Sequence, residues 1–150
     1  MKRFSGWVLF LIAVFGGTSA WAADASVWGT DYDQAIKLAA AEKKPLLIYF
    51  SGSDWCSECK RLTKEVFSQT EFLDYAKKNL VLLNLDFPQK REDRVALSPR
   101  NVELAKQYKI YGYPTVIVLD AEAKELGEFG YRVGGVKRWV GLIDELIVKK

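Results

Sequence analysis

The chain has 150 residues, of which 49% are hydrophobic and 27% charged, a composition that suits a single globular domain with a buried core. Its net charge of only +3 offers few contacts to phosphates, so nucleic acid is not an expected partner. The chain contains no histidine, which excludes a Cys-His hydrolase and a haem-attachment motif. Its two cysteines alone are too few ligands for a usual zinc site, so we expect no metal and no cofactor. A zinc ion shared between two copies of the chain stays open.

Residues 1–22 have the pattern of a secretory signal peptide. Two basic residues precede an apolar run from Trp7 to Phe15, and the tripeptide Ala20-Trp21-Ala22 fits the small-x-small rule for a cleavage site. We expect cleavage after Ala22, which would leave residues 23–150 as one domain in the periplasm or another exported compartment. The alternative is an uncleaved membrane anchor, but the run is far shorter than the ~20 residues that span a bilayer. No membrane span is expected after cleavage.

The first predicted helix leads into a buried strand. Asp31, followed three positions later by Gln34, resembles a capping box, and Pro45 stops the helix. The segment from Leu46 to Phe50 is continuously apolar, as expected for a strand covered on both faces, and we place it at the centre of the sheet. The helix side chains expected to face the core recur at helical spacing: Tyr32, Ile36, Ala39 and Ala40.

A dithiol follows the strand directly. Cys56 and Cys59 stand three positions apart at the start of a helical pattern, with Leu62 and Val66 continuing the apolar face. The free N–H groups and the positive dipole of a helix start stabilise an anion, so Cys56, expected at the exposed end, should ionise more readily than a free thiol. Cys59 is expected to face inward. A structural disulfide is the weaker reading, because closing so short a loop gains only roughly 2 kcal/mol.

The middle of the chain predicts another helix, a strand and a loop. Ser68 with Glu71 resembles a second capping box, and Val81–Leu85 reads as a second buried strand. Residues 87–100 read as a loop or short excursion whose mixed charges are either solvated or help to dock a partner. The pair Ser98-Pro99 then supplies an N-cap and a first helical residue for the next helix.

The last third predicts a helix, two strands and a final helix. The helix should bury Val102, Ala105 and Tyr108. We expect an apolar strand over residues 116–119, joined by a short turn to an edge strand over residues 125–130. The last helix carries a core-facing stripe: Trp139, Leu142, Ile143, Leu146 and Ile147.

This order of elements predicts an α/β fold, a sandwich in which helices flank a central mixed β-sheet. Helical crossovers suggest that the first strands are parallel, whereas the short turn near Asp120 joins antiparallel neighbours. The dithiol would then lie at the carboxyl end of a central strand.

The motif Trp55-Cys56-Ser57-Glu58-Cys59, together with Tyr113-Pro114-Thr115 at the start of an apolar strand, resembles the thioredoxin superfamily. The resemblance runs from Asp31 to the C-terminus and implies a thioredoxin-like fold. The segment from Glu65 to Asp86 is most similar to exported thioredoxin-like proteins and to the C-terminal domain of DsbD-type thiol reductases.

The resemblance implies roles for five residues. Cys56 would be the attacking thiolate and Cys59 the resolving thiol, a pair whose spacing suits a disulfide. Pro114 would be a cis-proline beside them, leaving the Tyr113 backbone free to pair with an extended substrate strand. Trp55 would cover one side of the dithiol and contact the substrate. The alternatives without a functional role are that Pro114 is an ordinary trans proline in a turn and that Trp55 only packs in the core.

The chain departs from the thioredoxin pattern behind the dithiol. Where thioredoxin has a buried Asp that helps to deprotonate the resolving cysteine, this chain has Tyr49, and the position of its Lys partner falls near Leu82. Glu58 is a nearby candidate for the missing proton acceptor. Asp54 and Ser53 are expected only to cap the helix.

The residues between the cysteines bear on the direction of electron flow. Strongly oxidising relatives place His there, whereas this chain has Ser57 and Glu58. A carboxylate repels the Cys56 thiolate and weakens the dithiol as an oxidant, so we expect a reductase or isomerase that acts on protein disulfides. In an exported compartment its electron donor would be a membrane thiol carrier. The alternative function is a thioredoxin-fold binding module or chaperone whose dithiol is incidental.

Overall fold

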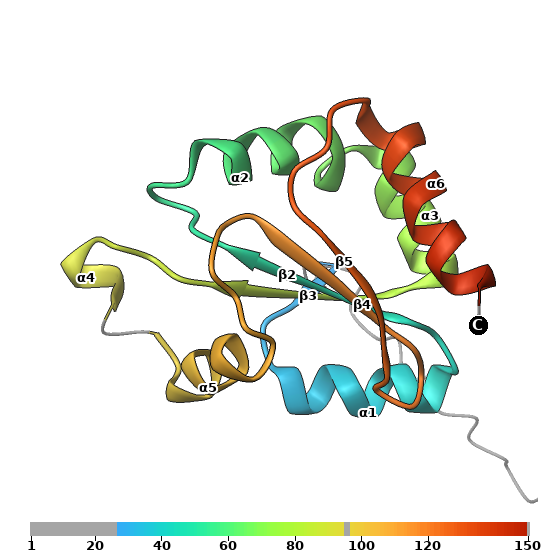
Figure 1. Ribbon diagram of the computed structural model, residues 1–150, viewed down its shortest axis with the longest axis horizontal. Coiled ribbons are helices and arrows are strands. Elements are labelled where there is room, and N and C mark those ends of the chain that lie inside the picture. The colour runs from blue at the N-terminus through green and yellow to red at the C-terminus, as the bar shows by residue number, and fades with distance from the viewer. Residues whose placement is uncertain (1–26, 95–96, 150) are drawn as a thin grey trace, which may run out of the picture.

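A five-stranded mixed sheet runs through the middle of the computed structural model, which describes residues 27–94 and 97–149 (Figure 1). The expected signal peptide and its cleavage site lie outside the described residues. The strands are β1 (Trp28–Gly29), β2 (Leu46–Ser51), β3 (Val81–Asp86), β4 (Thr115–Leu119) and β5 (Glu125–Phe129). The helices are α1 (Tyr32–Glu42), α2 (Ser57–Leu62), the π-helical turn η1 (Thr63–Phe67), α3 (Thr70–Asn79), α4 (Arg91–Arg94), α5 (Pro99–Gln107) and α6 (Gly135–Val148).

The strand order β1-β3-β2-β4-β5 puts β2 at the centre, as its continuous apolar run predicted. β2 is parallel to β3 and antiparallel to β4, and β5 returns antiparallel along the edge of β4. The parallel pairing of β2 with β3 and the antiparallel turn into β5 are confirmed. The short strand β1, which pairs with β3, was not expected, because two residues carry no alternation to recognise.

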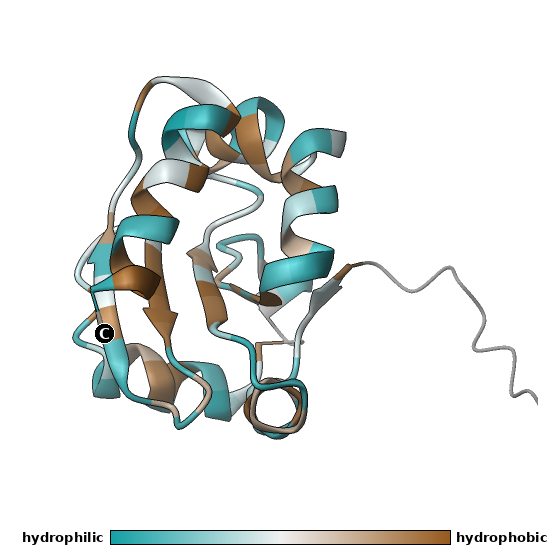
Figure 2. Cartoon of the chain, turned by 90° about the vertical axis from the view of Figure 1, so that its right-hand side faces the viewer, coloured by the Kyte–Doolittle hydropathy of each residue, from teal (hydrophilic) through white to brown (hydrophobic). Residues whose placement is uncertain are grey.

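Helices cover both faces of the sheet. In Figure 1, α2, α3 and α6 lie on one side, α1 and α5 lie on the other, and α4 projects beyond the end of β3. Figure 2 shows the apolar strands between helices that carry both hydrophilic and hydrophobic residues. The α/β sandwich predicted from the order of elements is therefore confirmed.

The side chains of β2 alternate between two buried clusters. Leu47 and Tyr49 pack against α2, η1, α3 and α6, whereas Leu46, Ile48 and Phe50 pack against α1 and α5. All five are at most 4% exposed. Burying an aliphatic side chain of this size stabilises a fold by roughly 1.5–3 kcal/mol, so both faces of the central strand hold it in place.

Three local predictions need correction. In α1, Asp31 does accept a hydrogen bond from the Gln34 N–H at 2.9 Å, but Ala35 and Ala39 are the buried residues and Ala40 is exposed. In α5, Ser98 is the N-cap as expected, yet Leu104 is buried and Val102 is 37% exposed. The other predicted residues do face the core, since Ala39 is buried and Tyr32, Ile36, Ala105 and Tyr108 pack against the same cluster; only Ala40 and Val102 are misplaced.

The third correction concerns the predicted capping box at Ser68. This serine ends η1 instead, and its hydroxyl donates to the Thr63 carbonyl at 2.8 Å. α3 begins two residues later, with Gln69 at its N-cap position and no side-chain cap. The π-helical turn η1 is wider than an α-helical turn and shifts the start of α3 along the chain. The sequence pattern does not predict this turn.

Candidate active site

The carboxyl end of β2 delivers the two cysteines to the first turn of α2, where they form a disulfide. Their Cα atoms lie 5.2 Å apart, within the range that a disulfide requires. Cys56 is the N-cap residue of α2, and its sulfur accepts a hydrogen bond from the Cys59 N–H at 3.1 Å. The sulfur expected to attack therefore lies where the helix dipole and a free N–H stabilise negative charge.

The expectation that Cys56 is exposed is wrong. Cys56 is 5% exposed and Cys59 is 2% exposed, and both belong to the buried cluster under α2 and α6. The disulfide to Cys59 and the hydrogen bond from the Cys59 N–H both hold the Cys56 sulfur against the first turn of α2. Ser57 and Glu58, which follow it, are exposed, so Cys56 lies directly under a surface that a partner can reach.

A tight turn over residues 52–55 positions the dithiol. The Gly52 carbonyl accepts hydrogen bonds from the N–H groups of Trp55 and Cys56, at 3.3 and 2.8 Å. A Cβ at Gly52 would collide with the indole of Trp55, so the ring can lie over the turn only because this residue is glycine. Sequence reasoning missed this position.

The side chains of Ser53 and Asp54 do not cap α2, contrary to expectation. Ser53 donates to the carboxylate of Asp86 through its N–H at 2.8 Å and its hydroxyl at 2.6 Å. Asp54 accepts the N–H groups of Gln89 and Lys90, at 3.0 and 2.8 Å. Ser53 instead ties the turn to the last residue of β3, and Asp54 ties it to the chain that follows.

Trp55 and Tyr113 meet beside the dithiol. Trp55 is 40% exposed, its indole N–H donates to the Phe87 carbonyl at 2.8 Å, and its ring lies edge-on to Tyr113 with 5.5 Å between centroids. Tyr113 packs against the cluster that holds both cysteines. The peptide bond between Tyr113 and Pro114 is cis, and Pro114 is buried. Trp55 is thus neither a core residue nor a free one, because it is fixed at one end and open to solvent at the other.

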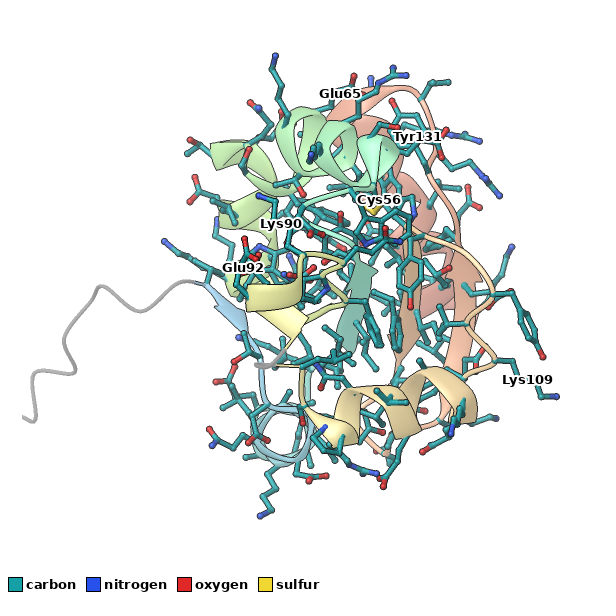
Figure 3. All side chains as sticks on the ribbon, turned by 90° about the vertical axis from the view of Figure 1, so that its left-hand side faces the viewer. Cys56, Glu65, Lys90, Glu92, Lys109 and Tyr131 are labelled. Atoms are coloured by element: carbon teal, nitrogen blue, oxygen red, sulfur yellow. A yellow bond between two sulfur atoms is a disulfide. The ribbon has the colours of Figure 1, made fainter. Side chains whose placement is uncertain are left out.

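Figure 3 views the molecule from the dithiol end, where Cys56 is seen between Tyr131 and Lys90. The Tyr131 hydroxyl donates to Glu65 at 2.6 Å, and the guanidinium of Arg61 lies 4.9 Å from the Tyr131 ring. The bond from Tyr131 is the main reason that the pKa of Glu65 is lowered, with Arg61 adding to it. This cluster ties the loop before α6 to the helix that carries the cysteines.

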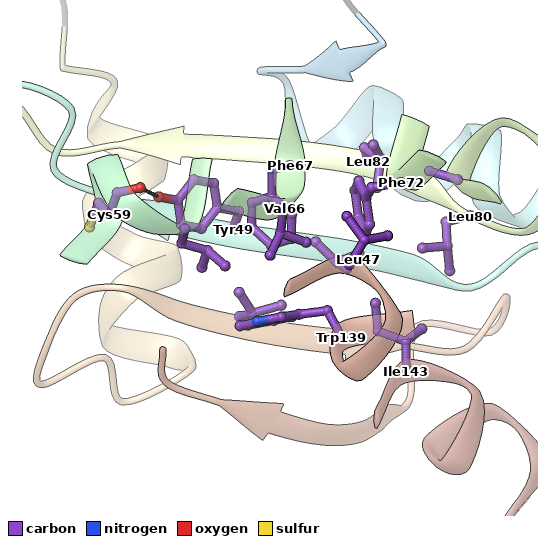
Figure 4. Close-up of a cluster of buried hydrophobic side chains, with 14 of the residues drawn as sticks. Leu47, Tyr49, Cys59, Val66, Phe67, Phe72, Leu80, Leu82, Trp139 and Ile143 are labelled. Carbon is purple, nitrogen blue, oxygen red and sulfur yellow. Dashed lines mark hydrogen bonds between the residues drawn. The ribbon is translucent and has the colours of Figure 1, made fainter. Parts of the chain in front are cut away.

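Tyr49 lies beside Cys59, as Figure 4 shows. Its hydroxyl donates to the Cys59 carbonyl at 3.0 Å and lies 3.4 Å from the Thr63 hydroxyl. Burial raises the pKa of Tyr49, and the negative charge of Asp86 adds to that rise. The residue that stands where thioredoxin has its Asp is therefore bonded to the backbone of Cys59 and stays protonated at neutral pH.

A pocket of about 390 Å³ opens beside Cys59, on the side of β2 and η1. Apart from Cys59, the residues that line it all carry a hydroxyl or an ammonium group, although much of the lining surface is their carbon: Tyr49, Ser51, Ser53, Thr63, Ser68, Lys60 and Lys64. Two polar residues of β3 lie behind it, since Ser51 donates to Asn84 at 2.8 Å and lies 3.2 Å from Asp86. Asn84 and Asp86 interrupt an otherwise apolar strand, a signal from which the sequence could have identified them.

Within residues 27–94 and 97–149, no helix is both long and apolar enough to cross a membrane. The same residues contain no group of three or more His, Cys, Asp or Glu side chains that could hold a metal ion.

Residues 32–135 match the family model described as a thioredoxin-like domain. Over 125 residues the chain is 32% identical to the disulfide bond reductase DsbH of Chlamydia pneumoniae, covering 83% of this chain and 75% of the relative. It is also 32% identical to the thioredoxin-related protein DsbJ of that organism and 33% identical to the thiol:disulfide interchange protein DsbD of Klebsiella pneumoniae. The aligned parts make up 74% and 65% of this chain, but only 33% of DsbJ and 14% of DsbD.

Solved structures show the same fold. A DsbH oxidoreductase superposes with a TM-score of 0.71 at 31% identity, over 82% of this chain and 85% of that one. The reduced C-terminal domain of DsbD from Neisseria meningitidis superposes with a TM-score of 0.60 at 21% identity, over 75% and 91% of the two chains. The second match supports the fold alone.

Proposed function

The chain belongs to the thioredoxin superfamily of thiol:disulfide oxidoreductases, and on that basis we propose that it is an exported reductase or isomerase of protein disulfides. The observation that carries the proposal is the Cys56–Cys59 disulfide at the N-cap of α2. A disulfide that closes so short a loop adds little to the stability of the fold. It is therefore better suited to thiol–disulfide exchange than to a structural role.

The reaction is two successive thiol–disulfide exchanges. In the reduced protein, the Cys56 thiolate attacks one sulfur of a substrate disulfide, the substrate S–S bond breaks, and the other substrate sulfur leaves as a thiolate. The Cys59 thiolate then attacks Cys56 and releases the second substrate sulfur. Two electrons pass from the dithiol to the substrate, and the Cys56–Cys59 disulfide seen in the structure is the oxidised product.

Three neighbours of the dithiol would bind the substrate. The Tyr113 backbone, preceding the cis bond to Pro114, is proposed to pair with an extended substrate segment. The half-exposed indole of Trp55 would cover an apolar side chain of the same segment. The edge contact between Trp55 and Tyr113 supports the proposal, because it joins the two elements that would form this surface.

Ser57 and Glu58 are proposed to set the redox poise. Both are exposed in the first turn of α2, where the carboxylate of Glu58 opposes the stabilisation that the helix dipole gives to the Cys56 thiolate. A less stable thiolate makes the oxidised protein a weaker oxidant. The direction expected is therefore reduction or isomerisation of substrates.

The proposal places the protein outside the cytoplasm, on the strength of the signal pattern in residues 1–22 and of its similarity to Dsb proteins. Each turnover leaves the dithiol oxidised, so a donor must reduce it. A membrane-borne thiol carrier is the proposed donor, because an exported compartment has no supply of a soluble reductant comparable to that of the cytoplasm.

Reduction of insulin in the presence of dithiothreitol tests this function. The wild-type chain should accelerate the precipitation of the released insulin B chain, and Cys56→Ser should abolish the acceleration. A binding module or chaperone with an incidental dithiol would instead delay precipitation to the same extent in both proteins, and that result would refute the proposed function.

A further inference from the structure

The second exchange requires Cys59 to lose a proton inside the protein. Cys59 is 2% exposed, and a thiol in apolar surroundings ionises with difficulty. Tyr49 cannot take the proton, because its hydroxyl donates to the Cys59 carbonyl and its raised pKa keeps it protonated. Glu58 is exposed on α2 and does not line the pocket beside Cys59. The acceptor must be reached from that pocket.

The pocket supplies a route. Its volume of about 390 Å³ exceeds many times the ~30 Å³ that a water molecule occupies, and its hydroxyl groups can hold such water. Cys59 and Ser53 both line it, so water in the pocket can lie between these two residues. The lining itself contains no carboxylate.

A carboxylate, that of Asp86, is hydrogen-bonded to the Ser53 hydroxyl of the pocket lining. Ser51 and Asp86 are paired across β2 and β3, so the Asp86 side chain lies behind the pocket wall. It accepts the Ser53 hydroxyl at 2.6 Å and the Ser53 N–H at 2.8 Å, and it lies 3.2 Å from the Ser51 hydroxyl. Among the hydrogen bonds of the described residues, those to Asp86 are the only ones that join a hydroxyl of this pocket to a carboxylate.

On the basis of the proposed function, we propose that Asp86 accepts the Cys59 proton through the Ser53 hydroxyl and pocket water. The proton passes from the Cys59 sulfur to water, water protonates the Ser53 oxygen, and the Ser53 proton moves to Asp86. The Cys59 thiolate then bonds to the Cys56 sulfur, the bond from Cys56 to the substrate breaks, and the substrate sulfur leaves as a thiolate. No external oxidant is needed, since the mixed disulfide supplies it.

In this chain the proton acceptor is not in the position of the buried Asp of thioredoxin; the proton reaches it through water and the Ser53 hydroxyl. Tyr49 lies beside Cys59 and bonds to its carbonyl, while the carboxylate lies on the neighbouring strand, where the N–H and the hydroxyl of Ser53 donate to it. The acid would thus serve the resolving cysteine without lying against it.

Stopped-flow reduction of 5,5′-dithiobis(2-nitrobenzoate) by the reduced full chain separates the two cysteines. The first coloured thiolate is released when Cys56 attacks, and the second when Cys59 resolves the mixed disulfide. In Asp86→Asn, the second phase should slow about 10- to 100-fold at neutral pH, as expected for loss of a general base, and recover as pH rises and hydroxide takes over. The first phase should keep its rate.

Matched variants exclude a general effect of charge or of pocket shape. Asp74→Asn removes an exposed carboxylate on α3, and Ser68→Ala removes a pocket hydroxyl that bonds only to the backbone of Thr63; both should show wild-type second phases. Ser53→Ala leaves Asp86 in place but cuts the relay, so it should slow the second phase with the same recovery at high pH. This variant serves also if Asp86→Asn does not fold.

Three results would overturn the role of Asp86. They are an unchanged second phase in Asp86→Asn and Ser53→Ala, a slowing by the same factor at every pH, and a pH-dependent slowing in Glu58→Gln instead. Because the reagent reports on the dithiol alone, failure of the wild-type chain to reduce insulin would count against the proposed function and not against this relay.

Discussion

Cys56 and Cys59 lie one helical turn apart, yet their surroundings give them different chemistry. Cys56 is the N-cap of α2 under an exposed turn, whereas Cys59 is bonded to Tyr49 through its carbonyl and lines the open pocket beside η1. We propose that Cys56, at the start of the helix, meets the other protein and that Cys59 reacts only with Cys56. This order of attack rests on the helix position and not on depth, because the two residues are 5% and 2% exposed.

Replacing Cys59 with Ser tests the order of attack directly. The variant should remain linked to substrate through Cys56, because no second thiol can resolve the mixed disulfide. The measurement is a non-reducing gel of the variant after incubation with an oxidised protein substrate, followed by mass analysis of the adduct. Cys56→Ser should give no adduct, since Cys59 lies within the helix and lacks the N-cap position that favours the Cys56 thiolate. Adducts through Cys59 would contradict the assignment.

Gly52 is the residue on which the position of Trp55 depends. Gly52→Ala puts a methyl group into the indole, so the ring must move and its bond to the Phe87 carbonyl is lost. We expect a loss of about 1–3 kcal/mol in the free energy of unfolding, as for other overpacked sites, and a changed Trp55 fluorescence. Urea unfolding gives the first quantity.

Gly141→Ala is the control for that experiment. Nothing lies within 4 Å of a Cβ at this position in α6, and alanine is the better helix former. This variant should gain about 0.5–1 kcal/mol. A Gly52→Ala protein as stable as the wild type would show that Trp55 is not held as described.

Among the elements, α2 is held by bonds that come from distant parts of the chain. Its preceding turn is bonded to the residues after β3 through Asp54 and Trp55, and Glu65 in η1 is bonded to Tyr131 before α6. The dithiol therefore depends on three connections that span more than 30 residues each. Short-range sequence patterns carry no information about such contacts.

Tyr131→Phe tests the connection between η1 and the loop before α6. The pKa of Glu65 is lowered in the folded state, chiefly by the Tyr131 hydroxyl, so this bond stabilises the fold above the ordinary carboxyl pKa of about 4.5. The stabilisation disappears as pH falls through the lowered value. The variant should melt a few degrees below the wild type at pH 7, and the difference should shrink in acid.

Thermal unfolding between pH 7 and pH 2 is the measurement for Tyr131→Phe. Tyr111→Phe, which changes a side chain that is 92% exposed, should follow the wild type throughout. A difference between Tyr131→Phe and the wild type that grows in acid would contradict the role given to Glu65.

For the whole molecule, the sequence alone predicted the order of elements, the central strand and the place of the dithiol. These features depend on local patterns: the continuous apolar run of β2, the Ser98 N-cap and the spacing of the two cysteines. The patterns did not predict the direction of β4, because a helical connection can lead to either orientation. Nor did they predict the burial of Cys56.

The polar residues behind the dithiol were the largest omission. Asp86 is distant from Ser51 and Ser53 in the sequence and reaches them only through the pairing of β2 with β3. Ser53 looked like a helix cap because its residue type is common at that position, whereas in the structure it bonds to Asp86. Contacts between strands decide both cases, and one sequence does not specify them.

The reduction potential of the Cys56–Cys59 pair, measured by equilibration with glutathione or dithiothreitol, tests the proposed reductase or isomerase function most directly. Thioredoxin lies at about −270 mV, protein disulfide isomerase at about −180 mV and the oxidant DsbA at about −120 mV. With Ser57 and Glu58 between the cysteines and no histidine, the potential should lie nearer to that of thioredoxin than to that of DsbA. A potential above about −150 mV would mean that the protein oxidises its substrates, which contradicts the proposed direction.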